Sequence, residues 1–228
     1  VLSVAEKMAT GDFGVEKISI TLPEGLSAKE MAEILDEKLP EFNKEEIIFL
    51  TKDLEGYIFP DTYRLFPSTN APDVVKIMQD TFDKKVRTAL AKDIDGSGKT
   101  MTEIITMASI IQDEAHDDYV EKQMISGILW KRIDKGMRLQ VDATLRYVNG
   151  KTSGQMTNAD LTFDHEYNTY TRAGLPPTPI GNPGVDSIKA AIYPKSSEYF
   201  FYLHASSGQV YYAETFEGHK KNINQYLR

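Results

Sequence analysis

The apolar residues of this chain follow two different periods, and this switch limits the possible folds more than any other feature. Residues 17–22 alternate between apolar and polar side chains, which predicts a strand that ends at a turn. Ser27 with Glu30 then forms a capping-box pattern, and Asn43 with Glu46 repeats it, so we expect two short helices after the strand. A strand followed by helices predicts a mixed α+β fold.

The helical period returns later in the chain. We expect helices over residues 73–92, 100–115 and 119–135, a hairpin from Tyr199–His204 and Val210–Ala213, and a last helix that begins at Thr215. Residues 54–63, rich in aromatics and broken by Gly and Pro, are predicted to connect two subdomains. Residues 93–99 are predicted to form a solvated loop, because the closing Glu of a calcium loop is missing. Residues 139–184 lack a clear period, and such long irregular stretches are usually functional.

Composition excludes several classes of protein. The 228 residues carry a net charge of −8 without clustered basic residues, so the chain lacks the cationic face that nucleic-acid binding requires. The longest apolar run, residues 47–50, is far shorter than the roughly 20 residues of a membrane helix. The absence of cysteine excludes disulfides and thiol chemistry. Because the chain begins at Val1, we expect a truncated start that lacks any native signal or anchor.

A helical wheel of residues 100–115 singles out one carboxyl group. When the apolar stripe is centred on Ile104, Asp113 points away from it. Gln112 and Glu114 lie on the two flanks of the stripe, and only Glu114 can titrate there. Partial desolvation raises the pKa of a carboxyl, as a general acid near neutral pH requires. Periodicity alone favours the alternative, an ordinary flank carboxylate paired with Lys or Arg.

Other familiar catalytic patterns do not occur in the sequence. The histidines, at positions 116, 165, 204 and 219, do not have the spacing of metal ligands. Serine-hydrolase, P-loop and dinucleotide motifs are also missing. We therefore expect neither a bound metal nor a cofactor.

The irregular stretch is the second candidate for a functional region. It places amide, hydroxyl and aromatic side chains on segments stiffened by proline, such as residues 167–170 and 174–184. Carbohydrate grooves use this mixture, because amides and hydroxyls bind sugar hydroxyls and aromatic faces cover the apolar face of the ring. The alternative is that the tyrosines and prolines only pack a long loop onto the core.

Several motifs occur together in an order that resembles one known family. They are Leu54–Tyr63, Met107–Glu114, Met137–Asp142, Tyr167–Tyr170, Gly174–Pro177 and Asn182–Gly184. Over nearly the whole chain they resemble the endolytic murein transglycosylases, the YceG-like or MltG family. The resemblance implies a LysM-like subdomain over residues 1–53, incomplete at its N-terminus, and a YceG-like catalytic domain over residues 54–228.

The resemblance also implies where such a protein acts and on what. It implies a bacterial enzyme at the extracytoplasmic face of the cytoplasmic membrane, held by a single N-terminal anchor that this chain lacks. The implied substrate is the glycan strand of nascent peptidoglycan, cut internally. Peptidoglycan synthases and the division machinery are the implied protein partners.

The resemblance further implies a mechanism that needs one glutamate, which falls at Glu114. This residue would cleave the β-1,4 bond between N-acetylmuramic acid and N-acetylglucosamine and leave 1,6-anhydro ends. The residues that match the substrate groove are Gln140, Asp142, Tyr167, Asn168, Tyr170 and Asn182. Arg132 also matches a family arginine, and its role, catalytic or structural, stays open.

Two alternative functions follow from particular residues. Gln112 stands where relatives are expected to have an acid, which suggests an inactive peptidoglycan-binding or scaffold protein of cell-wall synthesis. Asp142 offers a second carboxylate, which suggests an ordinary hydrolase, because hydrolysing glycosidases normally use a pair of carboxyl groups.

Overall fold

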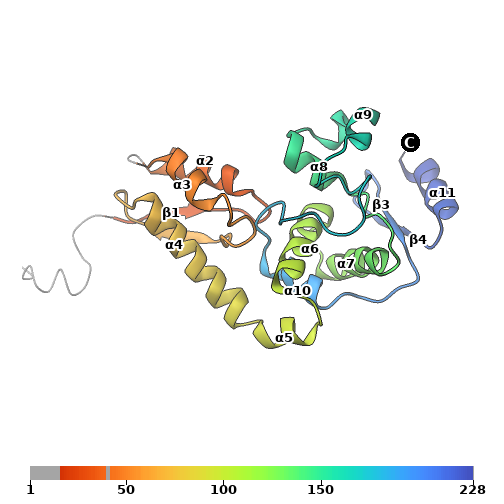
Figure 1. Cartoon of the computed structure of the whole chain (residues 1–228), viewed down its shortest axis with the longest axis horizontal. Helices are drawn as coiled ribbons and strands as arrows, with labels where there is room; N and C mark the ends of the chain where they lie inside the picture. Colours follow the sequence, from red (N-terminus) through yellow and green to blue (C-terminus); the bar gives the residue numbers. More distant parts are fainter. Residues whose placement is uncertain (1–15, 40–41, 228) are drawn as a thin grey trace, which may run out of the picture.

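The computed structural model describes residues 16–39 and 42–227, and these residues form a mixed α+β fold, as predicted (Figure 1). The expected truncation at Val1 lies outside the described residues. None of the helices in the described part of the chain combines the length and apolarity needed to cross a membrane.

The N-terminal unit pairs two short strands and packs helices against them. Its elements are β1 (Ile18–Thr21), α2 (Ala28–Lys38), α3 (Lys44–Thr51), β2 (Thr62–Leu65) and α4 (Ala71–Phe82). The two strands are antiparallel, with Ile18 opposite Leu65. The capping box of Ser27 and Glu30 is confirmed at the start of α2. Residues 54–63 were predicted to be a connection only, but their last two residues begin β2 because they pair with β1.

Two separate hydrophobic cores divide the molecule. The first extends from Ile20 in β1 to Met78 in α4, in the orange and yellow part of Figure 1. The predicted boundary between residues 53 and 54 falls inside this range, because β2 and α4 complete the N-terminal core. The LysM-like character of the unit stays a prediction.

The second core surrounds α6 (Met101–Glu114), which lies against α7 (Tyr119–Asp134) and α10 (Val185–Ile192) (Figure 1). Every residue of α6 from Ile104 to Ile111 is buried. Ile104, Ala108 and Ile111 of the predicted stripe are therefore buried, but so are the residues on both of its flanks, because α7, α8 (Asp142–Asn149) and α10 and the loops that carry Gly56 and Pro179 pack against this helix. Trp130 of α7 donates a hydrogen bond from Nε1 to the Ala191 carbonyl at 3.1 Å, which joins α7 to α10.

Several shorter elements differ from the sequence prediction. The helix predicted over residues 73–92 is interrupted by the π-helical turn η1 (Asp83–Thr88), and α5 (Ala91–Gly96) occupies part of the predicted loop. The irregular stretch contains α8 (Asp142–Asn149), the 3-10 turn η2 (Ser153–Gln155) and α9 (Asn158–Thr162). These corrections concern short helices, whose apolar period covers too few residues to stand out.

The C-terminal part agrees with the prediction. The strands β3 (Phe201–His204) and β4 (Val210–Ala213) form an antiparallel hairpin, with Phe201 opposite Ala213. Thr215 caps the last helix, α11 (Phe216–Tyr226), by accepting a hydrogen bond from the Gly218 main chain. The hairpin and α11 lie together at the blue end of the molecule (Figure 1).

Candidate active site

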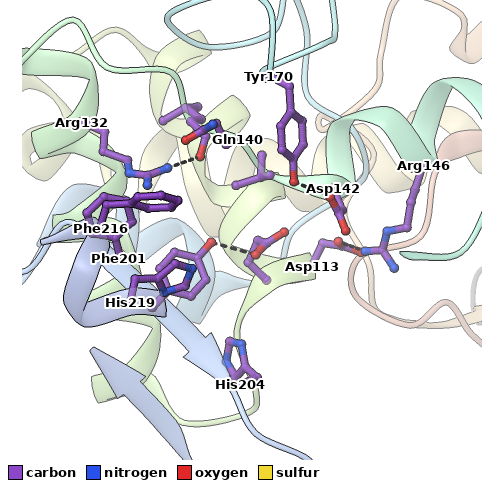
Figure 2. A pocket seen from close by; sticks show the side chains of 14 residues that line it. Asp113, Arg132, Gln140, Asp142, Arg146, Tyr170, Phe201, His204, Phe216 and His219 are labelled. Atoms are coloured by element: carbon purple, nitrogen blue, oxygen red, sulfur yellow. Dashed lines mark hydrogen bonds and ion pairs between the residues drawn. The ribbon is translucent and has the colours of Figure 1, made fainter. Parts of the chain in front are cut away.

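A pocket of about 480 Å³ opens where the end of α6, the start of α8 and the C-terminal hairpin meet. Figure 2 shows the side chains that line it. They are Asp113, Glu114, Arg132, Leu139, Gln140, Val141, Asp142, Arg146, Tyr170, Phe201, Tyr202, His204, Phe216 and His219. Carboxyl groups from α6 and α8 and aromatic rings from β3 and α11 therefore share one cavity.

Glu114 is the last residue of α6, and its half-buried side chain lines this pocket. The phenol of Tyr202 donates a hydrogen bond to Glu114 Oε2 at 2.7 Å. Burial raises the pKa of Glu114, the Tyr202 hydrogen bond lowers it, and the nearby carboxylates of Asp113 and Asp142 raise it, with a net pKa of about 7. The carbonyl end of a helix also disfavours an anion. The sequence predicted a partly desolvated carboxyl at this position, and the structure has one.

Asp113, predicted to point away from the core, is exposed, and its side chain also lines the pocket. It forms an ion pair with Arg146 of α8 (Figure 2). Burial raises the pKa of the Asp113 carboxyl, and the Arg146 guanidinium opposes this effect. The wheel could not place Arg146, which comes from a helix that the sequence did not predict.

Three of the predicted groove residues, Gln140, Asp142 and Tyr170, also line the pocket. Asp142 is the first residue of α8, and Tyr170 donates a hydrogen bond to its Oδ1 at 2.6 Å (Figure 2). Gln140 has a φ of 54°, the only positive φ of a non-glycine residue in the described ranges. Its main-chain N–H donates to the Thr169 carbonyl at 3.1 Å, which holds this conformation. Such backbone strain costs roughly 1–3 kcal/mol and is typical of functional sites.

The other predicted groove residues do not line the pocket. Asn168 is fully buried, and its amide donates to the Phe163 carbonyl at 2.7 Å and accepts from the Tyr170 main chain at 2.9 Å. Tyr167 shares a hydrogen bond of 2.6 Å with the Thr178 hydroxyl. Asn168 therefore holds the loop that carries Tyr170. Sequence patterns do not distinguish this structural role from contact with a ligand.

Asn182 lies at the junction of the two cores rather than in the pocket. Its fully buried amide accepts from the Gly56 main chain at 2.9 Å and donates to Glu55 Oε1 at 2.8 Å and to the Leu26 carbonyl at 3.0 Å. Four hydrogen-bonding positions of one side chain are thus engaged by the N-terminal unit and the segment after it. Asn182 fixes the relative position of the two cores.

Arg132 forms structural contacts with two segments that border the pocket. Its guanidinium donates to the Leu139 carbonyl at 2.5 Å and to the Phe200 carbonyl at 2.8 Å. It also lies over the ring of Phe201, 4.9 Å from the centroid. The sequence left the role of Arg132 open, and these contacts make it a residue that positions the strand β3 against the segment carrying Gln140.

Gln112 lies outside the pocket lining and stabilises the start of α10. Its Oε1 accepts hydrogen bonds from the Gly184 main chain at 3.1 Å and from the Ser187 hydroxyl at 2.7 Å. The first turn of a helix has main-chain N–H groups without partners in the helix, and Gln112 satisfies one of them. A structural reason therefore exists for an amide at this position.

Sequence reasoning missed the aromatic side of the pocket. Tyr202 and Phe216 belong to the predicted hairpin and last helix, but nothing in their local pattern indicates contact with α6. His204, at the pocket's edge, also belongs to a cluster with His116 and Glu121 whose atoms could hold a metal ion. The spacing argument did not detect this cluster, because its members are brought together only by the fold.

Comparison with known proteins places this chain among named relatives. A sequence model of the YceG-like family matches residues 1–225. The endolytic murein transglycosylase of Bacillus subtilis is 34% identical over 187 residues, which cover 82% of this chain and 50% of that protein. The protein of the same name from Streptococcus pneumoniae serotype 2 is 30% identical over 180 residues, covering 76% of this chain and 32% of that one. The chain thus spans half the length, or less, of these relatives.

A solved structure gives the same relationship. The crystal structure of a putative YceG-like protein from Listeria monocytogenes aligns with a TM-score of 0.81 and 30% sequence identity. The alignment covers 96% of this chain and 80% of that one. Sequence and fold agree over nearly the whole length, and this chain belongs to the YceG-like family.

Proposed function

We propose that this chain is a peptidoglycan lytic transglycosylase that cleaves within nascent glycan strands and uses Glu114 as its single acid and base. The observation that carries the proposal is a half-buried carboxyl with a pKa of about 7, hydrogen-bonded to Tyr202 and open to a pocket of about 480 Å³. Relatives named endolytic murein transglycosylase support this reaction over the other chemistries that a carboxyl in a pocket permits.

The first step is protonation of the leaving oxygen. Near neutral pH a carboxyl with a pKa of about 7 is protonated in about half of the molecules, which suits a general acid. Because Tyr202 donates to Oε2, the other oxygen, Oε1, is the one that carries the proton. It donates this proton to the glycosidic oxygen between N-acetylmuramic acid and N-acetylglucosamine as the bond from that oxygen to C1 breaks.

The second step returns a proton to Glu114. The carboxylate left by the first step accepts the proton of the muramic C6 hydroxyl, while the C6 oxygen bonds to C1 and closes a 1,6-anhydro ring. The same group therefore acts as acid and then as base, and no water is consumed. A hydrolase would normally need a second carboxyl to activate water or to attack C1.

The remaining pocket residues support this assignment. Carboxylates at Asp142 and Asp113 lie close enough to Glu114 to raise its pKa, and negative charge there stabilises the positive charge that develops at C1. Gln140 provides an exposed amide for sugar hydroxyls, and the rings of Phe201 and Phe216 offer apolar faces for the pyranose. Among the groove residues expected from the sequence, we keep Gln140, Asp142 and Tyr170 as substrate contacts.

The proposed substrate sets the proposed place of action. Nascent glycan strands are found at the extracytoplasmic face of the bacterial cytoplasmic membrane, so this is where we propose that the protein works. An N-terminal anchor, peptidoglycan synthases and the division machinery complete the proposal, as the family resemblance implies.

The test compares the chain ends released from purified uncrosslinked glycan strands by the parent protein and by Glu114→Gln. Mass spectrometry is expected to find new 1,6-anhydro ends with the parent and none with the variant. Glu33→Gln, at an exposed position on α2, is the matched control and should behave like the parent. Circular dichroism and a melting curve establish that each variant is folded.

Three outcomes would contradict the proposal. Reducing ends instead of anhydro ends would make the protein a hydrolase and point to Asp142 as its second carboxyl. Binding of strands without any new ends would favour the scaffold function. Equal activity of Glu114→Gln and the parent would remove Glu114 from the reaction.

A further inference from the structure

Three side chains that commonly bind metals meet at the edge of the pocket. His116 follows the end of α6, Glu121 lies in the first turn of α7, and His204 ends β3. One nitrogen or oxygen atom of each lies within 4.8 Å of the other two. We call these residues the His-Glu-His cluster.

Two of the three separations within the cluster are close to those of a metal site. Oε1 of Glu121 lies 3.2 Å from His116 Nδ1 and 3.0 Å from His204 Nε2. The two imidazole rings are 4.7 Å apart and inclined by 73°. In a tetrahedral zinc site with bonds of about 2.0–2.1 Å, ligand atoms lie about 3.3 Å from one another. Small side-chain rotations would therefore be enough for all three atoms to coordinate one ion.

The backbone holds the central carboxylate in place. Asp118 caps α7 by accepting from the main-chain N–H groups of Val120 and Glu121, at 2.7 and 3.0 Å. The main-chain N–H of His116 donates to Glu121 Oε1 at 2.8 Å. The Glu121 side chain is only 12% exposed, whereas that of His116 is 54% exposed. The carboxylate is therefore held inside the protein, and the cluster is accessible to solvent at His116.

We propose that the His-Glu-His cluster binds one divalent transition-metal ion, with Zn²⁺ as the expected occupant. Two imidazoles and one carboxylate form a donor set found in zinc sites that keep one position open for water. Imidazole favours zinc, copper and nickel over magnesium and calcium, which prefer oxygen ligands. The inference rests on these three residues alone and is independent of the proposed transglycosylase reaction.

The position of the cluster gives the ion a structural consequence. His116 lies two residues after Glu114, and His204 lies two residues after Tyr202. A bound ion would connect the two segments that carry the hydrogen bond between Glu114 and Tyr202. It would also anchor the hairpin to the start of α7.

The test measures metal binding by the full chain with any affinity tag removed. After dialysis against a chelator, calorimetric titration with Zn²⁺ is expected to reach one equivalent per chain. Co²⁺ in place of Zn²⁺ should give the intense visible absorption of a four-coordinate ion. His116→Gln and Glu121→Gln are expected to weaken Zn²⁺ binding by about 100-fold or more, since even indirect supporting residues contribute 10–100-fold.

His165→Gln is the matched control, because His165 lies outside the cluster, and it should retain the affinity of the parent. Uptake of no Zn²⁺ by the parent would overturn the proposal and leave the cluster as a hydrogen-bonded group. Parent-like affinity in both cluster variants would overturn it equally, by placing the ion elsewhere. The stoichiometry and the Co²⁺ spectrum of the parent decide the question even if a variant fails to fold.

Discussion

The carboxyl groups of Glu114 and Glu55 share a raised pKa and differ in the contacts that surround them. Burial raises the pKa of Glu114 and of Glu55 to about 7 in both cases. Each also accepts a hydrogen bond from a tyrosine, Tyr202 in the first case and Tyr147 in the second. A perturbed pKa by itself would nominate both residues as catalytic.

Their other contacts separate them. Glu55 accepts from the Ala28 main chain at 3.0 Å and from the Asn182 amide at 2.8 Å in addition to Tyr147, and it does not line the pocket. In the described part of the chain, Tyr202 is the one residue that donates a hydrogen bond to Glu114. The carboxyl oxygens of Glu55 therefore accept hydrogen bonds that join the two cores, whereas Glu114 has an oxygen that can still bind a substrate. Free hydrogen-bonding capacity in a cavity distinguishes a catalytic carboxyl better than its pKa does.

The largest expected difference between the two groups is in activity. Glu114→Gln should reduce glycan cleavage about 1000-fold, because general acid–base catalysis contributes roughly 10²–10⁴-fold. Glu55→Gln should change the rate by no more than a few-fold. The rate of appearance of new chain ends under equal conditions measures both. A comparable loss in folded Glu55→Gln would show that the junction takes part in the reaction.

The second prediction concerns stability, and it uses Glu55 because the proposed reaction does not involve this residue. An unfolded Glu loses its proton near pH 4.5, whereas folded Glu55 keeps it until about pH 7. Between these values the folded state binds more protons, so the free energy of unfolding falls as the pH rises. The shift corresponds to about 3 kcal/mol lost across this window. Glu55→Gln should remove this loss, because an amide does not ionise.

Urea unfolding at pH 4.5 and pH 7.5 tests this prediction. The parent should lose about 3 kcal/mol more than Glu55→Gln between the two pH values. Glu33→Gln, which changes an exposed carboxyl on α2, should follow the parent. Equal losses in parent and Glu55→Gln would mean that Glu55 ionises in the folded protein as it does in the unfolded chain.

The contrast also shows how far the sequence predicts such a molecule. The capped helix at Ser27, the terminal hairpin and the desolvation of Glu114 follow from local patterns, and all three are present. Helices α8 and α10 were not predicted, and their N-cap residues, Val141 and Gly184, make no side-chain cap. For α10, Gln112 of α6 supplies the missing hydrogen-bond acceptor.

The site was only partly predictable for the same reason. An asparagine in a motif has the same sequence signal whether its amide binds a sugar or a main chain, so Asn168 and Asn182 could not be separated from Gln140. Tyr202 lies 88 positions from its partner Glu114, and only the packing of the hairpin brings them together. Contacts between distant segments are the part of the site that local patterns do not contain.

A smaller effect should sharpen the comparison of the two tyrosines. The Tyr202 hydrogen bond lowers the pKa of Glu114, so Tyr202→Phe should raise it, by about one unit for a hydrogen bond to a charged group. Because the acid must be protonated, activity falls as the pH rises through this pKa, and the falling limb should move to higher pH. The dependence of kcat/KM on pH measures the shift. Tyr147→Phe, which alters the partner of Glu55, should leave the limb unchanged.

The smallest expected effect comes from returning an acid to position 112. Both donors that Gln112 binds, the Gly184 N–H and the Ser187 hydroxyl, would also bind a carboxylate, and the start of α10 favours negative charge. Against this, Gln112 hydrogen-bonds the Glu24 carboxyl, and a second carboxylate there would repel it. Gln112→Glu should therefore cost about 1 kcal/mol of stability or less and change activity by less than about threefold.

A melting curve and the same cleavage assay measure the two effects of Gln112→Glu. Gln112→Ala is the useful companion, because it removes the cap of α10 without adding charge and should lower stability by about 1 kcal/mol. A tenfold gain of activity in Gln112→Glu would mean that an acid two residues before Glu114 takes part in the reaction. Unchanged activity would leave Glu114 as the only carboxyl of α6 that the reaction needs besides the ion-paired Asp113.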